Sequence, residues 1–409
     1  MSRVILHCDM NSFFASVELL SHPELQEVPV AVCGDPASRK GIILAKNEAA
    51  KGFGVRTAET IWQARQKCPD LVLLPPHHHR YREFSRLVNA IYGQYTDLVE
   101  PFGIDESWLD ITGSMHLFGG DPREIADSIR QRVRRELGLT LSVGVSFNKV
   151  FAKLGSDYKK PDATTVISPE NWQGIVWPLP VGSLLFAGPA AQRALGQYGI
   201  HTIGQLASAD MALPQELLGK LGHQLWCYAN GLDDSPVRPQ HLQEPVKSVG
   251  NSTTFRENLT TRQEIRRGTA LLCDSVASRL RQQGLYCRGV QVGLRDPSFH
   301  NISRQKHLPH STHLMRELLS AAMELIDQIW RAPSPVRLIS VTALDLTDRL
   351  ETYEQEDLFT PAQPQIDARQ ERLEQAMDSI RRRFGGKAIA YGEASDSTFS
   401  APDEGEEGS

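Results

Sequence analysis

Residues 4–20 read VILHCDMNSFFASVELL. The apolar run at 4–8 predicts a buried strand that runs directly into Asp9, and the helical spacing of apolar residues at 12–20 predicts a short helix after it. A charged side chain at the end of a buried strand costs free energy unless it reaches solvent or a cation. Asp9 is therefore a candidate for a functional site, although an Asp after a strand is also often a helix cap.

A second acidic position lies within the apolar segment GIDESWLDI at 103–111. Neighbouring residues of a regular strand point to opposite faces, so Asp105 and Glu106 can face one cation only if the chain turns or bulges there, which Gly103 permits. A lone Asp-Glu pair is usually a solvated turn. Three acids from two strands, followed by a lysine-rich segment, nevertheless supply the parts of a two-metal phosphoryl-transfer site.

The rest of the chain divides by its patterns. The N-terminal part alternates between strand and helix patterns, whereas residues 168–236 are short helical pieces split by Gly and Pro. Residues 238–245 are a polar linker candidate. From residue 247 the order is strand, helix, strand, strand, helix, strand, which is the split βαββαβ unit. A charged helix is expected at 365–384.

Charge is distributed unevenly along the 409 residues. The whole chain has a net charge of −5, whereas residues 238–348 carry 15 Lys and Arg against 10 Asp and Glu. A basic block in an acidic protein is typical of a module that binds a polyanion. The six Cys form no CxxC pair, which argues against a zinc ribbon or a disulfide scaffold. We find no membrane span and no signal-peptide pattern, so we expect a cytoplasmic protein.

Three strings resemble motifs of the Y-family translesion DNA polymerases, most closely those of the DNA polymerase IV branch. They are DMNSFFASVE at 9–18, GIDESWLD at 103–110, and SVGVSFNK at 142–149, which continues to Lys153 and then to Lys160-Pro161. Their order and spacing are those of the family, and the resemblance covers residues 1 to about 345.

The resemblance implies an α/β (α+β) multidomain fold of the right-hand polymerase type. Its parts would be a catalytic palm (1–11 and 79–167), small fingers (12–78), a helical thumb (168–237), a linker (238–246), a βαββαβ little finger (247–348), a segment with a clamp-binding motif and a C-terminal helix (349–392), and a disordered acidic tail (393–409).

The same resemblance implies roles for individual residues. Asp9, Asp105 and Glu106 would be the catalytic carboxylates that bind two Mg²⁺ ions, and Met10 would add its backbone carbonyl. Phe14 would be the steric gate, a ring beneath the incoming sugar that leaves no room for a 2′-hydroxyl. The residues that would contact the nucleotide are Phe13, Phe14, Lys51 and Lys160. From the pattern alone, Phe14 would instead be a core residue and Lys160 a solvated turn lysine.

The chain departs from the family motifs at several positions. Glu48 and Lys51 stand where the family has Tyr and Arg, and Lys51 keeps the charge of Arg but not its bidentate fork. We expect Glu48 to turn away from the phosphates or to pair with a lysine such as Lys46. Asn11 replaces an Asp that is not one of the three metal acids.

DNA and a clamp are the macromolecular partners that the resemblance implies. The basic residues expected along backbone phosphates are Lys247, Arg256, Arg288, Arg295, Arg304 and Lys306. The string QEDLF resembles the bacterial sliding-clamp pentapeptide, with Gln355, Leu358 and Phe359 as its anchors. The run of three His at 77–79 is expected to be a surface loop, or else a weak phosphate contact.

The function implied is template-directed DNA synthesis past damaged bases, with low processivity and low fidelity, by a monomer that uses primer-template DNA and deoxynucleoside triphosphates. Two other classes stay open from the residues. A palm-type core could belong to a nucleotide cyclase or a metal-dependent nuclease, although a cyclase needs no grip on duplex DNA. A non-catalytic DNA or clamp adaptor is the other alternative.

Overall fold

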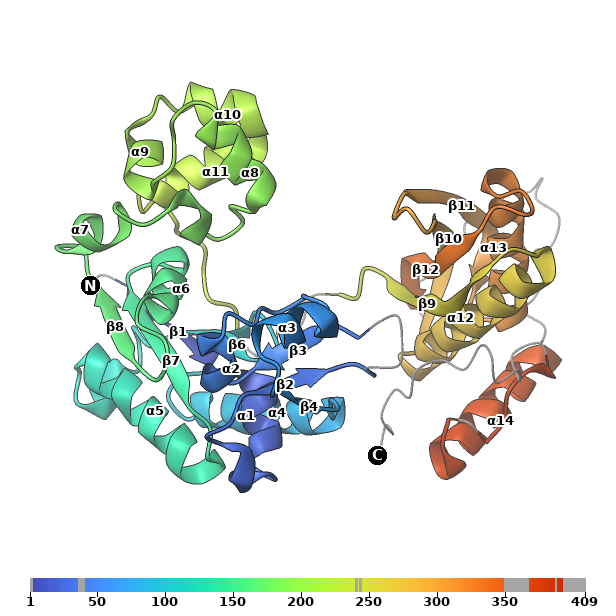
Figure 1. The fold of residues 1–409 in the computed structure, drawn as a ribbon, viewed down its shortest axis with the longest axis horizontal. Coiled ribbons are helices and arrows are strands. Elements are labelled where there is room, and N and C mark those ends of the chain that lie inside the picture. Colours follow the sequence, from blue (N-terminus) through green and yellow to red (C-terminus); the bar gives the residue numbers. More distant parts are fainter. Residues whose placement is uncertain are drawn as a thin grey trace. The chain divides into compact units, whose positions relative to one another are not determined.

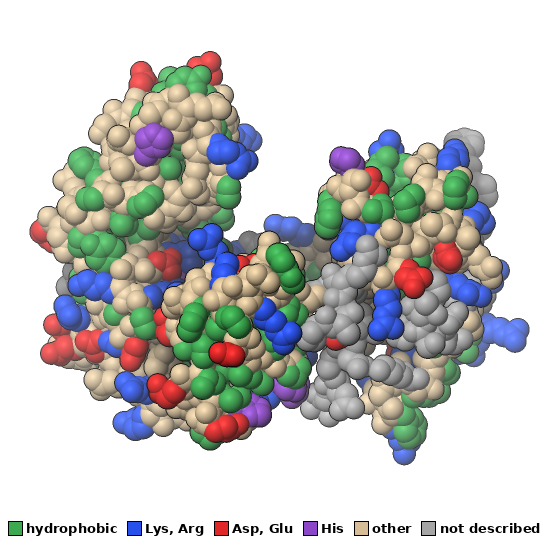
Figure 2. All heavy atoms as spheres, in the orientation of Figure 1, with side chains coloured by type: hydrophobic (Ala, Val, Ile, Leu, Met, Phe, Trp, Pro, Cys, Tyr) green, Lys and Arg blue, Asp and Glu red, His purple; other side chains and the backbone are tan. Residues whose placement is uncertain are grey.

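The computed structural model describes residues 3–35, 41–239, 242, 245–348, 368–386 and 388–392. The chain forms two compact units, one within residues 1–243 and the other within residues 244–409. Figure 1 traces the chain through both units, and Figure 2 shows side chains on one face of each. Among the described residues, no helix is both long and apolar enough to cross a membrane.

A five-stranded sheet forms the centre of the first unit, in the order β5-β6-β1-β7-β8. Its strands are β1 Ile5–Met10, β5 Val99–Pro101, β6 Glu106–Asp110, β7 Leu141–Ser146 and β8 Thr164–Ile167. β1 lies between β6 and β7 and is antiparallel to both, whereas β8 runs parallel to β7. The predicted N-terminal strand is therefore the central strand of the sheet.

Helices cover both faces of this sheet (Figure 1). α4 His78–Tyr92 and α5 Pro122–Leu137 share a core with one face, and α6 Lys149–Tyr158 packs on the other. α6 approaches β7 closely at Gly144, where an added Cβ would lie only 1.8 Å from the Ala152 carbonyl oxygen. This close packing brings the side chains of α6 to the end of β1.

A smaller sheet follows α1 Phe13–Leu19, in the order β3-β2-β4. Asn47 and Thr60 cap the two short helices beside it through their side chains. The elements of this part are η1 Pro23–Leu25, β2 Val30–Cys33, β3 Ile43–Lys46, α2 Glu48–Gly52, α3 Ile61–Lys67 and β4 Val72–Leu74. A further 3₁₀ turn, η2 Met115–Phe118, precedes α5.

Short helices with a core of their own complete the first unit, as the Gly- and Pro-split pattern predicts. They are α7 Trp172–Val176, η3 Val181–Ser183, α8 Pro189–Gly196, α9 Ile203–Ser208, α10 Ala212–Leu218 and α11 Lys220–Ala229. The turn between α8 and α9 contains Gly199 with a φ of +76° and ends at Thr202, which caps α9.

The second unit is the predicted βαββαβ arrangement, and its sheet has the order β11-β10-β12-β9. Its elements are β9 Val249–Leu259, α12 Arg262–Gln282, β10 Leu285–Arg295, β11 Asn301–Thr312, α13 Met315–Ile329 and β12 Val336–Asp348. All neighbouring strands are antiparallel, and both helices share the core on one face of the sheet. The strands are longer than the sequence patterns predicted.

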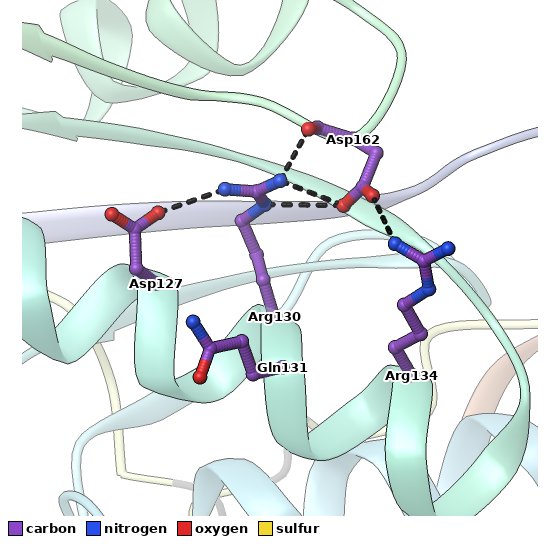
Figure 3. A pocket seen from close by; sticks show the side chains of 5 residues that line it. All are labelled: Asp127, Arg130, Gln131, Arg134 and Asp162. Carbon is purple, nitrogen blue, oxygen red and sulfur yellow. Dashed lines mark hydrogen bonds and ion pairs between the residues drawn. The ribbon is translucent and has the colours of Figure 1, made fainter.

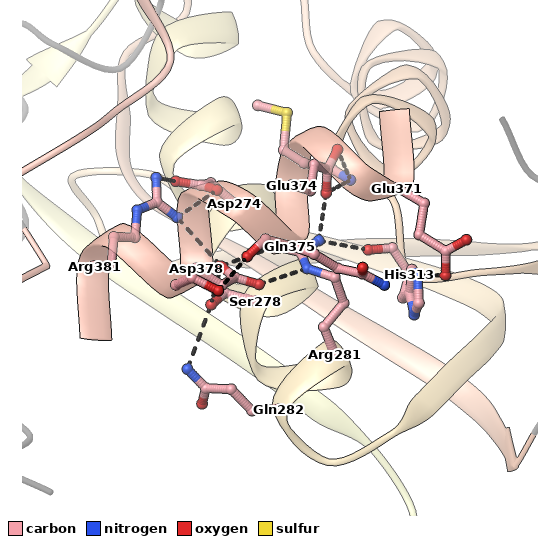
Figure 4. Close-up of polar contacts among 12 residues, drawn as sticks. Asp274, Ser278, Arg281, Gln282, His313, Glu371, Glu374, Gln375, Asp378 and Arg381 are labelled. Carbon is pink, nitrogen blue, oxygen red and sulfur yellow. Dashed lines mark hydrogen bonds and ion pairs between the residues drawn. The ribbon is translucent and has the colours of Figure 1, made fainter. Parts of the chain in front are cut away.

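The charged helix predicted at 365–384 is α14 Ala368–Phe384, which packs on α12 (Figure 4). Arg281 forms ion pairs with Glu374 and Asp378, and Arg381 Nη2 lies 2.7 Å from Asp274 Oδ2. The Arg281 side chain is only 5% exposed. Because a buried charge is costly without its partner, these pairs hold α14 in one position on the second unit.

Candidate active site

β1 and β6 carry two of the predicted carboxylates in register. Asp9 and Glu106 are cross-strand partners, and so are His7 and Trp108. Cross-strand partners share a face of the sheet, so Asp9, Glu106 and His7 all lie on the face that α6 covers. One ligand atom from each of these three residues lies within 4.8 Å of the other two.

Asp105 is brought to the same end of the sheet by a turn. The N–H groups of Phe102 and Gly103 both donate to the Glu106 carbonyl, at 3.0 and 3.2 Å, and the N–H of Met10 donates to the Asp105 carbonyl at 3.0 Å. An added Cβ on Gly103 would lie 3.3 Å from both Asp105 Oδ1 and Glu106 Cγ, which explains the glycine. β6 begins only at Glu106, so Asp105 belongs to the turn, and it is not one of the three residues, His7, Asp9 and Glu106, whose ligand atoms lie within 4.8 Å of one another.

Cationic and neutral side chains of the protein surround the acids. Lys160 Nζ lies 2.8 Å from Asp9 Oδ2, and Lys153 forms a close ion pair with Glu106. The ring of His7 is fully buried, with Nδ1 2.8 Å from Ser156 Oγ and Nε2 3.3 Å from Glu106 Oε2. The two lysines therefore balance part of the acidic charge.

The neighbouring carboxyls respond differently to this environment. Burial and the repulsion from Asp9 and Glu106 raise the pKa of Asp105 to about 6. Burial would also raise the pKa of Glu106, but its contacts with His7 and Lys153 outweigh burial and lower that pKa to about 2. Burial lowers the pKa of His7, so its ring is neutral at neutral pH. The charge of Asp105 is thus poorly compensated by the protein, as expected of a cation ligand.

Replacing Asp105 with Asn should stabilise the metal-free protein at pH 8. Between about pH 4 and pH 6 the unfolded chain releases the Asp105 proton while the folded chain still holds it, so the free energy of unfolding falls across this range. Above about pH 6 Asp105 is ionised in both states, and the folded state carries the full cost of its charge. Removing the charge should gain about 1–2 kcal/mol at pH 8 and little at pH 4, after allowance for solvent screening. Thermal unfolding in a chelator at both pH values measures this difference.

Asp97→Asn is the matched control, because Asp97 is exposed, whereas Asp105 is partly buried beside Asp9 and Glu106. Its unfolding temperature should match that of the parent at both pH values. An Asp105→Asn protein that is no more stable than the parent at pH 8 would show that burial and the neighbouring acids do not penalise the Asp105 charge in the folded chain.

The sequence alone did not identify His7 and Lys153 as site residues. His7 precedes Asp9 by two residues, so the alternation of a strand already placed both on one face, and that signal was available. Lys153 is different, because it reaches Glu106 only through the close packing of α6 on β7 at Gly144. Local patterns carry no information about that contact.

α1 places its two phenylalanines in different surroundings. Phe13 is 3% exposed, and its side chain belongs to the core beneath the sheet. Phe14 is half-buried and stacks on Tyr81, with ring centroids 4.0 Å apart and planes 11° apart. His78 meets the Phe14 ring edge-on at 5.8 Å. The Phe14 ring is therefore held rigidly, as a steric gate requires.

The run of histidines lies on the surface, as expected, but two of its members are helical rather than in a loop. His78 and His79 form the first residues of α4, and His77 is its N-cap residue. His77 Nδ1 lies 3.0 Å from Glu18 Oε2, and the buried Glu18 carboxylate also accepts a hydrogen bond from Tyr81. The loop prediction failed because this tertiary contact fixes the start of α4 against α1.

Glu48 pairs with Lys51 rather than with Lys46. Lys51 Nζ lies 3.3 Å from Glu48 Oε1, and both side chains are about half exposed on α2. Ser12 Oγ donates to the same carboxylate oxygen at 3.3 Å, whereas Lys46 Nζ donates to Thr57 Oγ1 at 3.1 Å. The charge of Lys51 is therefore partly neutralised by its neighbour one turn away.

The basic residues predicted to contact DNA do not share one face of the second sheet. Arg304 and Lys306 lie opposite core valines of β10, so they are on the helix-covered face, and Lys306 Nζ lies 2.5 Å from Glu324. Arg256 and Arg295 each follow a buried residue, so they are on the open face. Lys and Arg side chains lie at several separate places on the face of this unit shown in Figure 2.

Comparison with known proteins gives consistent results for both units. Residues 8–157 match the impB/mucB/samB family, and residues 246–358 match the C-terminal domain of that family. DNA polymerase IV of Acetivibrio thermocellus is 45% identical over 96% of this chain and 97% of its own length. DNA polymerase IV 1 of Bacillus subtilis is 38% identical over 96% of this chain and 93% of its own.

A solved structure shares the fold. It is a Y-family DNA polymerase chimera that superposes with a TM-score of 0.75, at 23% identity, over 84% of this chain and 99% of its own. The mixed helix-and-sheet, multidomain fold expected from the sequence is confirmed by this match.

Proposed function

The chain belongs to the impB/mucB/samB family of Y-family DNA polymerases, and we propose that it extends primers by a two-metal reaction at Asp9, Asp105 and Glu106. It is a DNA-directed DNA polymerase of the translesion class. The observation that supports the two-metal site most directly is the register of Asp9 with Glu106, to which a turn adds Asp105. Relatives named DNA polymerase IV that match nearly the whole chain disfavour a cyclase, a nuclease or an adaptor.

The donor set fits a hard divalent cation. Carboxylate oxygens, with the Met10 carbonyl at the end of β1, are the kind of ligand that Mg²⁺ prefers. When bound, two such ions would activate the attacking oxygen and stabilise the leaving group of a phosphoryl transfer. His7 and Lys153 keep Glu106 ionised, so its carboxylate is available to a cation at neutral pH. In this proposal Glu106 is the acid nearest the primer 3′-hydroxyl.

Lys160 is the main triphosphate contact in this proposal. It lies at the acidic cluster, and although burial would lower its pKa, Asp9 and Asp157 raise it, so Lys160 stays charged. Lys51 contributes less to triphosphate binding, because its ion pair with Glu48 offsets part of its positive charge. The stacked ring of Phe14 would lie beneath the sugar and exclude a 2′-hydroxyl.

Primer-template DNA is held by sequence-independent contacts in this proposal. The open face of the second sheet carries Arg256 and Arg295, and the thumb adds the backbone amides of the turn between α8 and α9. Phosphate contacts of this kind are salt-sensitive and carry little sequence information. We further propose that the enzyme is a cytoplasmic monomer that synthesises DNA with low processivity and low fidelity.

Primer extension tests the proposal. The chain, supplied with Mg²⁺ and deoxynucleoside triphosphates, should add a few nucleotides per binding event to a primer on undamaged and lesion-bearing templates. A chelator should stop the reaction. Binding of primer-template without extension in any divalent cation would instead support an adaptor, and DNA cleavage or nucleotide cyclisation would support the other alternative.

Loss of the clamp motif should affect synthesis only when the clamp is present. Gln355, Leu358 and Phe359 lie outside the described residues, so the proposal rests on the sequence. Replacing Leu358 and Phe359 with Ala should reduce clamp-stimulated synthesis roughly 10-fold, since tethering raises the local concentration of the polymerase on DNA. Synthesis on primed templates with and without a bacterial sliding clamp measures the effect.

Glu354→Gln with Glu356→Gln is the control for that pair, because it changes the same segment and spares the apolar anchors. It should keep clamp stimulation. Equal loss of synthesis with and without clamp in the Leu358 and Phe359 variant would point to a structural role for the segment.

A further inference from the structure

Two arginines of α5 bind Asp162 in the turn that follows Lys160, and Arg130 makes most of the contacts (Figure 3). Arg130 Nε and Nη2 lie 3.2 and 2.8 Å from Asp162 Oδ1, and Nη2 also donates to the Asp162 carbonyl. Asp162 has a φ of +49°, a left-handed conformation that costs free energy for a residue other than Gly. The three contacts compensate for that cost two residues beyond Lys160.

Arg130 is itself held in place. Its Nη1 lies 2.8 Å from Asp127 Oδ1, which also accepts a hydrogen bond from Thr164 Oγ1 at 2.6 Å, and its side chain is 19% exposed. A pocket of about 330 Å³ is lined by Asp127, Arg130 and Asp162, together with Gln131 and Arg134. Arg134 reaches the other oxygen of Asp162 at 3.4 Å but is 70% exposed. Arg130 is therefore the better ordered of the two arginines.

Asn11 fastens the same turn from the side of β1. With its amide oxygen toward the backbone, the buried Asn11 side chain accepts from Asp162 N at 3.0 Å and from Leu141 N at 3.3 Å. Its amide nitrogen then donates to Ser142 Oγ at 2.9 Å. Because Asn11 lies two residues after Asp9, this contact ties the Lys160 turn to the strand that carries the acid.

We infer that Arg130 is a positioning residue for the polymerase reaction, acting through Asp162 to hold Lys160 at the acidic cluster. The inference rests on the proposed contact between Lys160 and the triphosphate. Lys160 Nζ lies 2.8 Å from Asp9 Oδ2 and 2.7 Å from Asp157 Oδ1, and because a lysine side chain is long and flexible, the position of its backbone decides whether it can reach Asp9. Without the Arg130 contacts, Asp162 keeps the Asn11 contact at its N–H and the exposed Arg134 at Oδ2, but loses the bonds to its carbonyl and to Oδ1 that support the left-handed conformation.

Single-nucleotide incorporation on primer-template DNA tests the inference. Arg130→Gln should raise KM for the incoming nucleotide roughly 10-fold and change kcat less, because a misplaced binding group costs substrate affinity first. Lys160→Ala should lower kcat/KM by roughly 10- to 100-fold, the loss of one charge-assisted contact to phosphate. In the Lys160→Ala background, Arg130→Gln should have no further effect, since its role runs through that lysine.

Arg134→Gln is the matched control, because it removes the exposed arginine from the same carboxylate. Its KM should stay within about twofold of the parent, as expected of an exposed ion pair. Asp162→Asn weakens the same contact with a nearly isosteric side chain and gives the same test if Arg130→Gln does not fold. Arg130→Lys should give a partial increase in KM, since one bond to Asp162 survives.

The outcomes separate the inference from the proposal on which it rests. If Lys160→Ala leaves kcat/KM unchanged, the triphosphate contact is wrong, and the positioning role is wrong with it. If Lys160→Ala is impaired but Arg130→Gln is normal, or is equally harmful with and without Lys160, only the positioning role is overturned. An increase in KM that disappears in the Lys160→Ala background supports both.

Discussion

Primer extension is expected to fall by about three orders of magnitude when Glu106 is replaced with Gln or Asp9 with Asn. Both substitutions keep size and hydrogen-bonding atoms but remove one negative charge from the cluster in which the two residues face each other across β1 and β6. A neutral amide binds a hard divalent cation far less tightly than a carboxylate. Single-turnover incorporation at saturating nucleotide and Mg²⁺ measures the loss.

Two controls keep this result from being mistaken for unfolding. Glu83→Gln removes an exposed acid of α4 and should leave the rate unchanged. The affinity of the Glu106 and Asp9 variants for primer-template DNA should stay within about twofold of the parent, because phosphate contacts elsewhere supply it. Variants that fold, bind DNA and extend at the parental rate would refute the two-metal assignment.

The positions of the acids were predictable because they depend on local rules. Asp9 was recognisable as a charge at the end of an apolar strand, and Glu106 as part of an acid pair that follows a glycine. Once the two strands pair, the alternation of side chains places both residues on one face. The βαββαβ order of the second unit follows in the same way from hydrophobic periodicity. The same rules would have found His7, two residues before Asp9.

Contacts between distant segments were not predictable from one sequence. Lys153 reaches Glu106 because glycines let α6 approach β7. His78 and His79 are helical because Glu18 on α1 holds the N-cap residue His77. From the sequence alone it was not clear whether Lys306 lies on the face of the second sheet that the helices cover or on the opposite, open face. The pairing of β10 with β11 decides this. Packing also places the side chain of Phe13 in the core, so the predicted contact of this residue with the nucleotide stays a prediction.

Replacing Phe14 with Ala is expected to admit ribonucleotides, with the preference for deoxyribonucleotides falling by roughly 100-fold. The face-to-face stack on Tyr81 and the edge contact with His78 fix the Phe14 ring, so a 2′-hydroxyl that collides with it has no room to move the ring aside. Alanine removes the obstacle without adding a hydrogen-bonding group. The ratio of kcat/KM for a deoxyribonucleotide to that for the matching ribonucleotide measures the preference.

The matched variants separate a gate from a packing residue. Phe14→Tyr keeps the ring and should keep the preference, whereas Phe13→Leu should lower the unfolding temperature, because it leaves a cavity in the core, and should spare the preference. The stack also makes Phe14→Ala remove packing from Tyr81, so some loss of stability should accompany the change in sugar selection. If Phe14→Ala loses stability but selects sugars as the parent does, Phe14 supports α1 and another group must exclude the 2′-hydroxyl.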